Sequence, residues 1–411
     1  MSGAPHVLVI GAGIVGLSCA RAMCRDGHAV TVLDRDPAGD KASFGNAGGL
    51  GITEILPAAA PGLIWQVPRW LADPLGPLSL RPAHLPRLLP WLRRFLRSGT
   101  PAETARIAAA LAGLLAPVYD DILPLLDELG LSGDLHRVGA LWVYETEAGF
   151  NRDAAPHALR RRHGIEVEAI SADQARRLEP ALAPVVARAV VTPQWSHVDD
   201  PKRIVDRLRQ VLEARGVRFL RQEATGIDGG AVITATGERL PFDRLVVAAG
   251  AWSGRLARAA GDRVLIESER GYNATLPSPG LQLRREIIFA ERQFVATPLE
   301  IGLRIGGAAE FAGLEAAPNW RRSDALVTLA RRYLPDLDAR NAQRWMGHRP
   351  TTPDSLPVIG KSPRQPYVFY AFGHGHLGLT LGPTTGRLVA DLVGGRTPPI
   401  DLAPFSIKRF N

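Results

Sequence analysis

The chain of 411 residues has little of what disulfide-rich, metal-binding and membrane-spanning proteins need. Its two cysteines, Cys19 and Cys24, are too few for a disulfide framework or a cysteine-based metal site. No uncharged apolar run reaches the roughly 18 residues of a spanning helix, so we expect none. The N-terminus shows no basic segment followed by a removable apolar stretch, which predicts a mature, cytoplasmic chain.

Other absences narrow the class of function. No long Lys/Arg block alternates with aromatic residues, so we expect no nucleic-acid partner. No G-x-S-x-G elbow is present, which argues against a serine hydrolase. Near the C-terminus, His374 and His376 lie between glycines, but no cysteine or carboxylate cluster complements them at metal-ligand spacing, so we predict no metal site.

What is present describes a globular protein of ordinary composition. Apolar residues make up 46 % of the chain and charged residues 22 %, and its length favours two domains. The 49 basic and 41 acidic residues give a net charge of +8, spread along the chain. This excess favours anionic substrates or a membrane surface.

A short apolar strand, residues 6–10, leads directly into a glycine turn. Gly11, Gly13 and Gly16 follow in the G-x-G-x-x-G spacing of dinucleotide-binding folds. In this pattern Gly11 makes the tight turn, Gly13 lets the backbone approach a pyrophosphate, and Gly16 lets the helix pack against the strand.

The next helix and strand complete the dinucleotide-binding unit. The helix opens with Ile14 and Val15, so its positive N-terminal end would meet the phosphates. The second strand, residues 29–34, ends in Asp34, which would accept a hydrogen bond from a ribose hydroxyl and repel a 2′-phosphate. NADP is therefore disfavoured, although the neighbouring Arg35 leaves it open.

A second glycine-rich stretch, residues 41–51, follows where a simple NAD domain would enter another helix. It resembles a loop of the amino-acid oxidase and dehydrogenase superfamily that binds FAD, typified by D-amino-acid dehydrogenase, glycine oxidase and sarcosine oxidase. In that superfamily the loop lies against the pyrophosphate and flavin; an ordinary surface loop is the alternative. The matching positions are Ser43, Asn46, Ala47, Gly48 and Gly49.

Further matches follow in the family's order at 242–254, 345–360 and 372–392, so the resemblance spans nearly the whole chain. It is closest to the D-amino-acid dehydrogenase branch, and it implies non-covalent FAD. The cofactor contacts that it adds are Ala249, Gly250, Trp252, Gly373, His374, Gly375, His376, Leu377, Gly378 and Thr380.

The closing turn would let backbone and helix approach the flavin ring. Gly373 and Gly375 permit close approach, Gly378 packs the helix start, and the helix N-terminus would face the flavin. We expect His374 to make a polar contact at the flavin edge or pocket, with a packed, hydrogen-bonded histidine as the alternative. His376 is expected to be structural.

The predicted fold class is α/β and α+β: a Rossmann-type FAD-binding domain with a discontinuous antiparallel-sheet substrate domain. Strand-like segments that do not continue the Rossmann pattern form the second domain, which the helical stretch 104–130 would complete. The predicted FAD-binding segments are 1–80, 196–258 and 344–411, and the predicted substrate segments are 81–195 and 259–343.

Oxidation of an amino acid by a flavin moves a hydride from Cα to N5, so the protein mainly has to fix the carboxylate. The resemblance implies an arginine of the G-x-R-P segment and a tyrosine of the substrate sheet, matched here by Arg349 and Tyr272. Arg304 is a second basic candidate. A salt bridge is the alternative for each arginine, and a packed sheet residue for Tyr272.

The predicted function is an FAD-dependent D-amino-acid dehydrogenase that forms an imine, which water converts to a 2-oxo acid and ammonia. A D-proline or hydroxy-D-proline type substrate would stop at the cyclic imine. Electrons would pass to a quinone or another acceptor of the respiratory chain. The alternatives are an oxygen-using glycine, sarcosine or N-substituted amino-acid oxidase, and a non-catalytic flavin-binding protein.

Residues 85–99 have leucines at helical spacing with arginines between them, a pattern typical of a short interfacial helix. Pro86 and Pro90 are expected to confine regular helix to about its last two turns. The alternative is a helix that covers the core and exposes a basic face. Peripheral contact with the inner face of the membrane is therefore one expectation for this segment.

Overall fold

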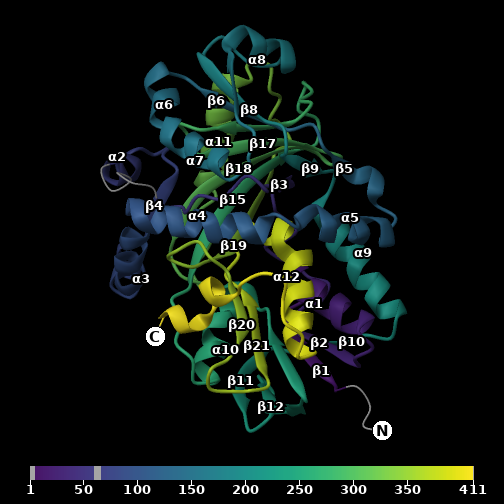
Figure 1. The fold of residues 1–411 in the computed structure, drawn as a ribbon. Helices are drawn as coiled ribbons and strands as arrows, with labels where there is room; N and C mark the ends of the chain where they lie inside the picture. The colour runs from purple at the N-terminus through teal and green to yellow at the C-terminus, as the bar shows by residue number, and fades with distance from the viewer. Residues whose placement is uncertain (1–4, 60–65, 411) are drawn as a thin grey trace.

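The computed structural model describes residues 5–59 and 66–410. Two β-sheets dominate it, one below and one above the middle of the molecule as drawn in Figure 1. The helices α4, Pro101–Leu115, and α5, Val118–Glu128, run across the middle between them.

The lower sheet is the dinucleotide-binding sheet. Its central strands are buried apolar segments such as VLVI in β1, as expected where helices or other elements cover both faces. Neighbouring strands are parallel except for β20, which pairs antiparallel with β21. In spatial order its strands are β10 (Arg218–Arg221), β2 (Val30–Asp34), β1 (Val7–Ile10), β14 (Arg244–Val247), β21 (Val368–Phe372) and β20 (Val358–Lys361).

The upper sheet is mixed, and not purely antiparallel as predicted. Most neighbours are antiparallel, but β16 runs parallel to β6, and β4 (Leu78–Leu80) runs parallel to β18. Both parallel pairs join segments that are distant in sequence, so strand direction there depends on chain topology. The main path of the sheet is β19 (Gln343–Thr351), β15 (Glu267–Leu276), β18 (Gly302–Phe311), β17 (Phe294–Leu299), β16 (Glu286–Phe289), β6 (Ala140–Tyr144), β8 (Arg188–Thr192) and β7 (Glu168–Ser171).

Two smaller sheets and further helices accompany the two large sheets. One small sheet contains β11 (Ala224–Asp228), β12 (Ala231–Thr234) and β13 (Arg239–Pro241), and another contains β3 (Gly49–Leu50), β9 (Ser196–Val198) and β5 (Leu135–His136). The other α-helices are α1 (Ile14–Arg25), α2 (Val67–Ala72), α3 (Leu85–Ser98), α6 (Glu147–Arg152), α7 (Ala154–Arg162), α8 (Ala172–Leu178), α9 (Pro201–Ala214), α10 (Ser253–Ala259), α11 (Arg321–Tyr333) and α12 (Gly378–Val393).

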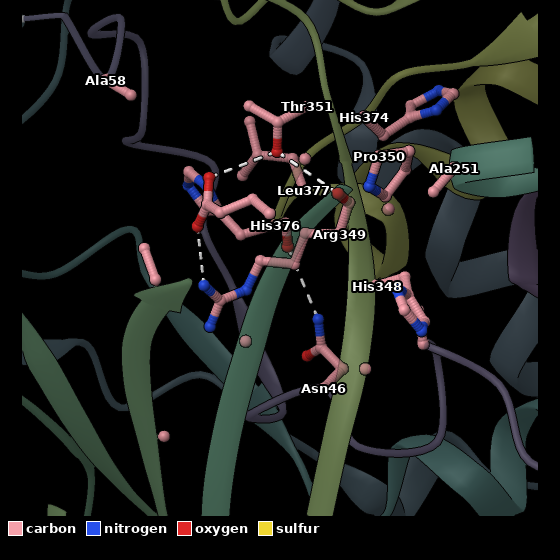
Figure 2. A pocket seen from close by; sticks show the side chains of 18 of the residues that line it. Asn46, Ala58, Ala251, His348, Arg349, Pro350, Thr351, His374, His376 and Leu377 are labelled. Atoms are coloured by element: carbon pink, nitrogen blue, oxygen red, sulfur yellow. Dashed lines mark hydrogen bonds and ion pairs between the residues drawn. The ribbon is translucent and has the colours of Figure 1, made fainter. Parts of the chain in front are cut away.

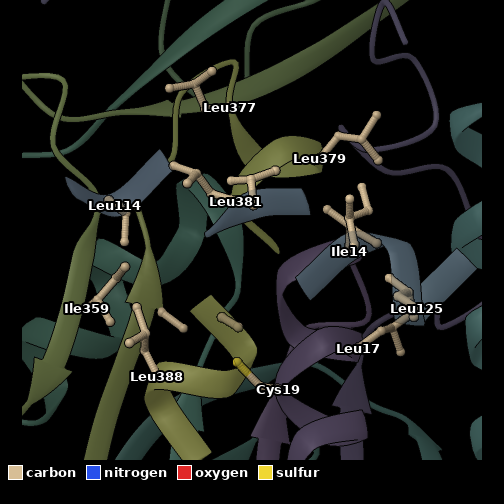
Figure 3. Packing of buried hydrophobic residues seen from close by; sticks show 14 of the residues in the cluster. Ile14, Leu17, Cys19, Leu114, Leu125, Ile359, Leu377, Leu379, Leu381 and Leu388 are labelled. Atoms are coloured by element: carbon tan, nitrogen blue, oxygen red, sulfur yellow. The ribbon is translucent and has the colours of Figure 1, made fainter. Parts of the chain in front are cut away.

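The core of the lower half includes helices that we had assigned to the substrate domain. Figure 3 shows α1 and α12 facing residues of α4 and α5 in one apolar cluster. The labelled side chains from these helices are Ile14, Leu17, Cys19, Leu114, Leu125, Leu379, Leu381 and Leu388. The helices α4 and α5 thus pack against α1 and α12 of the predicted FAD-binding domain, in a cluster that also contains Tyr144 and Val190 of the upper sheet. Apolar periodicity indicates that a helix is buried but not against what.

Two predicted domain boundaries also differ from the structure. The segment 344–411 was assigned to the FAD-binding domain, yet β19 pairs with β15 in the upper sheet over nine residue pairs. The segment 1–80 was assigned there as well, yet β4 pairs with β18. Each element lies next to a predicted boundary, and long-range pairing decides which sheet it joins.

Two helical segments bear on membrane contact. By length and composition, the segment Pro101–Glu128 is apolar enough to cross a membrane. Its apolar stretch of 18 residues has a mean hydropathy of 1.5, and 39 % of that stretch is buried. Because α4 and α5 form this segment and pack in the core shown in Figure 3, we interpret them as core helices. The helix α3 spans Leu85–Ser98, so the prediction that Pro86 and Pro90 confine regular helix to its last two turns is wrong. Pro86 lies in the first turn, where no helical hydrogen bond needs its N–H, and Pro90 removes one such bond inside the helix without ending it.

Candidate functional site

The glycine turn after β1 has the geometry that a dinucleotide needs. Gly11 has φ +113°, and an added Cβ there would lie 2.3 Å from the carbonyl oxygen of Ala248. An added Cβ on Gly16 would lie 1.9 Å from the Gly11 carbonyl oxygen. At Gly13, in contrast, an added Cβ would meet only Ser43 Oγ, at 3.5 Å. The two outer glycines are thus packing positions, and Gly13 borders open space where a pyrophosphate fits.

The acid at the end of β2 is fixed beside this turn. Asp34 Oδ2 accepts a hydrogen bond from Ala12 N at 2.8 Å, and Oδ1 lies 3.2 Å from Lys41 Nζ. The Arg35 guanidinium stacks on the Trp252 ring, with 4.0 Å between Cζ and the ring centroid. These contacts hold a carboxylate at the position that binds a ribose hydroxyl in this type of fold.

The loop that follows is held from both sides. Ser43 Oγ accepts from the first helical amide, Ile14 N, at 3.1 Å, and Asn46 Oδ1 accepts from Gly48 N at 2.8 Å. Buried Arg304 donates to the carbonyl oxygens of Phe44 and Asn46 at 3.1 and 2.7 Å. Burial lowers the pKa of the Arg304 guanidinium to about 10. Arg304 therefore anchors the loop and does not line the cavity described below, which corrects its assignment as a second carboxylate-binding candidate.

The closing turn approaches the same space from the opposite end of the chain. Gly373 and Gly375 have φ of +83° and +54°, a region that favours glycine, and α12 begins at Gly378. His374 Nε2 lies 2.9 Å from Thr385 Oγ1 within α12, and burial lowers its pKa to about 3. In Figure 2 its ring points away from Arg349. The ring is thus packed and hydrogen-bonded, which is the alternative considered for it, while the residue still borders the cavity described below, so its contact with the flavin edge stays a prediction.

A cavity of about 1180 Å³ joins these segments to the upper sheet. Most predicted cofactor positions line it, whereas Gly16, Gly48, Gly373 and Thr380 pack behind its wall. Thr380 Oγ1 accepts from Gly51 N at 3.1 Å. The predicted positions along the cavity are Gly11, Gly13, Ile14, Val15, Asp34, Arg35, Ser43, Asn46, Ala47, Gly49, Ala249, Gly250, Trp252, His374, Gly375, His376, Leu377 and Gly378.

Arg349 enters the cavity from β19, as Figure 2 shows. Its Nη1 donates to Glu269 Oε1 at 2.7 Å and to the Ala308 carbonyl at 3.2 Å, while Nη2 donates to the Gly307 carbonyl at 3.2 Å. Within residues 5–59 and 66–410, Nε donates to no protein acceptor. Of the five N–H donors of the guanidinium, the Nε proton and one Nη2 proton therefore stay available.

Tyr272 is placed differently from the expectation. The residue is 1 % exposed, and its hydroxyl donates to Glu310 and accepts from Asn319 N at 2.9 Å. Burial and Glu310 raise the pKa of the phenol to about 12. Arg270 pairs with the same carboxylate at 3.1 Å. The hydroxyl is thus part of a buried network, which favours the packed-sheet alternative for Tyr272. The residue nevertheless lines the cavity, so its contact with a substrate carboxylate stays a prediction.

Sequence reasoning missed the far end of the cavity. Trp142 and Glu286 reach it from β6 and β16, and Trp195 joins them from the loop after β8. Glu54 and Arg160, 3.2 Å apart, form an ion pair on the same wall. The acid in REIIF, an otherwise apolar strand, was the one signal in the sequence that could have indicated Glu286.

These features fit FAD: open space at Gly13, a fixed acid at Asp34, and two glycine-rich segments converging on one large cavity. Together they define a dinucleotide-binding flavoprotein fold with a separate substrate sheet, which confirms the predicted fold class. The chain belongs to the FAD dependent oxidoreductase family, whose sequence model matches residues 6–392. It is therefore an FAD-dependent oxidoreductase, and the predicted resemblance and cofactor are confirmed.

Relatives cover nearly the full length of the chain. A D-amino-acid oxidase of Bradyrhizobium diazoefficiens is 40 % identical over 98 % of this chain and 99 % of its own length. A D-amino acid dehydrogenase of Methylobacterium nodulans is 33 % identical with the same coverage. The crystal structure of glycine oxidase from Geobacillus kaustophilus superposes with a TM-score of 0.76 at 24 % identity, covering 99 % of both chains, and supports the fold.

Proposed function

We propose that the protein oxidises D-amino acids at Cα and that Arg349 binds the substrate carboxylate. The observation that carries this proposal is the pair of unused N–H donors on Arg349, a residue that lines a cavity whose other residues fit FAD. FAD, when bound, supplies the acceptor for a hydride from Cα.

Three protein acceptors fix the plane of the fork before substrate arrives. Glu269, Gly307 and Ala308 take both protons of Nη1 and one proton of Nη2. A carboxylate then fits the remaining pair of donors with two parallel hydrogen bonds. Because the guanidinium is already oriented, less conformational entropy is lost on binding and Cα is held at a defined place.

Apolar side chains around Arg349 would exclude water from the bound substrate. Apolar side chains of the upper sheet and of α3 line the cavity, including Val295, Ile288, Trp91 and Phe95. The N-terminal end of α12 approaches the cavity with its partial positive charge. Hydride removal from a neutral amine needs neither a nucleophile nor a strong base, so positioning is the main contribution of these residues.

The D-amino-acid oxidase and dehydrogenase names of the relatives support the choice of substrate class. The product would be an imine, which water converts to a 2-oxo acid and ammonia, whereas a D-proline type substrate would stop at the cyclic imine. Glycine and N-substituted amino acids remain part of the substrate panel below.

We propose a quinone or another respiratory-chain component as the electron acceptor, reached at the inner face of the membrane. The outer side of α3 supports it: Leu85, Leu89 and Leu96 are exposed there, together with Arg93 and Arg97. The inner side of the same helix lines the cavity. An interfacial helix at this place would bring the cavity close to a membrane-dissolved acceptor.

Rapid mixing of the purified protein with D-amino acids, their L-enantiomers, glycine and sarcosine under nitrogen tests the proposal. Bleaching of the flavin absorbance by D-enantiomers is expected. No bleaching by any amino acid would indicate a non-catalytic flavin-binding protein. Stoichiometric peroxide on re-aeration would show that oxygen, and not the proposed respiratory-chain component, accepts the electrons. It would not change the proposed substrate class.

A further inference from the structure

Glu286 is a buried carboxylate with one oxygen available to the cavity. It opens β16, is 2 % exposed, and lies on the cavity side with Ile288, since residues two apart on a strand share a face. Its Oε2 accepts from Trp195 Nε1 at 2.9 Å. Among the described residues no donor reaches Oε1, and this oxygen is not sealed from the cavity.

The surroundings of Glu286 are negative and otherwise apolar. An added Cβ on Gly49 would lie 2.1 Å from Glu286 Oε2, so the carboxylate packs directly on the glycine-rich loop. Trp142 and Ile288, neighbours across β6 and β16, line the space beside it, and the Arg160 guanidinium stacks on the Trp142 ring with 4.7 Å between Cζ and the ring centroid. The nearby Glu54 adds a second negative charge, but the Arg160 guanidinium already pairs with it. Buried carboxylates of this kind require a hydrogen-bond donor or a cation.

Glu286 lies too far from Arg349 to meet the same end of a substrate. The Arg349 guanidinium bonds β18 at Gly307, which pairs with Phe294 and through it with Phe289 on β16. From Gly307 to Glu286 the path crosses two strand spacings, from β18 to β16, and then follows β16 for three residues, from Phe289 to Glu286. The backbone positions of Gly307 and Glu286 are therefore on the order of 14 Å apart. The α-amino and α-carboxyl groups share one carbon, so of a substrate held by Arg349 only the far end of its side chain is distant enough to reach Glu286.

We propose that Glu286 binds a cationic group at the end of that side chain, so that the enzyme prefers D-amino acids with long basic side chains. This proposal rests on the function proposed above, with Arg349 at the carboxylate. The ammonium of D-lysine or the guanidinium of D-arginine would supply the donor that Oε1 lacks, between the walls of Trp142 and Trp195.

The test compares D-lysine with D-norleucine, which has a methyl group in place of the aminomethyl group. Anaerobic flavin reduction gives kcat/KM for each, and the wild-type protein should favour D-lysine. In Glu286→Gln the amide oxygen can still accept from Trp195, but the charge is lost. The D-lysine to D-norleucine ratio should then fall roughly 10- to 100-fold, with FAD content unchanged.

Glu179→Gln is the matched control. Glu179 is also fully buried in the substrate half but bonds Arg285 and does not line the cavity, so its loss should leave the ratio unchanged. A wild-type preference for D-norleucine, or equal losses of kcat/KM for both substrates in Glu286→Gln, would overturn the proposal for Glu286. Turnover of D-norleucine in the same experiment would still support the proposed oxidation of D-amino acids. Flavin bleaching by neither substrate would overturn both.

Discussion

The guanidinium of Arg349 lies flat across Gly271 on the neighbouring strand. An added Cβ at Gly271 would be 2.4 Å from Arg349 Cζ, too close for both groups to keep their places. Because the far end of a flexible side chain can move, Gly271→Ala should fold normally and displace the fork. We expect kcat/KM for D-amino acids to fall about 10- to 100-fold, measured by anaerobic flavin reduction, with FAD content and melting temperature nearly unchanged.

Gly226→Ala provides the control for this variant. Gly226 also lies in a strand, β11, but an added Cβ there would have its nearest neighbour at 3.7 Å. It should leave the kinetics unchanged. A Gly271→Ala protein with normal kcat/KM would show that the position of the Arg349 fork does not matter to the reaction.

Substitution of Arg349 separates charge from geometry. Arg349→Lys keeps the charge but loses the fork, so flavin reduction should slow and binding should weaken. Arg349→Ala should cost about 2 to 4 kcal/mol of transition-state stabilisation while FAD content stays normal. An amine without a carboxylate should respond little to either change. Equal losses for the amine and the amino acid would assign Arg349 to structure.

Two substitutions in the first glycine turn should have different effects, one on FAD binding and the other on the stability of the fold. Gly13 has φ −76°, which valine tolerates, so Gly13→Val should fold but leave no room for the pyrophosphate. Gly16→Val should instead destabilise the fold, because its Cβ would meet the backbone of Gly11. Flavin absorbance and thermal unfolding of the purified proteins distinguish these effects. Full FAD occupancy in Gly13→Val would contradict the assignment of this turn.

The dinucleotide-binding unit could be predicted because its signals are local. The strand end, the three glycines and Asp34 all lie within one stretch of chain, and β1, α1 and β2 form there with nearly the predicted limits. Membership of a sheet is not local. The residues of β19 and β4 resemble other strands, and only pairing with β15 and β18 assigns them to the upper sheet.

The direction in which a side chain points, like membership of a sheet, depends on residues distant in sequence, so it could not be predicted for the candidate site. Arg304 and Tyr272 lie on neighbouring strands of the upper sheet, but Arg304 reaches the loop at Asn46 and Tyr272 reaches Glu310. A family pattern gives the residue type at a position and not the partner that a hydroxyl or guanidinium finds there. Glu286 lacked any motif, because its environment comes from segments more than 90 residues apart.

The membrane proposal can be tested on the outer side of α3. Leu89 and Leu96 are each 41 % exposed, whereas Trp91 of the same helix is buried and donates to the Thr351 carbonyl at 3.0 Å. Replacing both leucines by glutamine should weaken co-sedimentation with anionic vesicles roughly tenfold without changing flavin reduction. Leu123→Gln, at an equally exposed leucine of α5, is the control. Unchanged vesicle binding would count against membrane contact through α3.

The ionisation of Glu286 gives a pH dependence with a definite sign. Burial, aided by the charge of Glu54, raises the pKa of the Glu286 carboxyl to about 8 in the free protein. Below that pH the carboxyl is neutral, and a bound ammonium must displace its proton. The affinity for D-lysine should therefore rise by up to about tenfold per pH unit below pH 8 and level off above it.

The ratio of D-lysine to D-norleucine isolates this effect, because deprotonation of the α-amine affects both substrates alike. The ratio, obtained from anaerobic flavin reduction between pH 6 and about 9, should climb and reach a plateau near the pKa of Glu286. In Glu286→Gln the ratio should stay flat, since no carboxyl titrates there. A wild-type ratio that is flat with pH, or a slope that survives in Glu286→Gln, would place the titrating group elsewhere in the cavity.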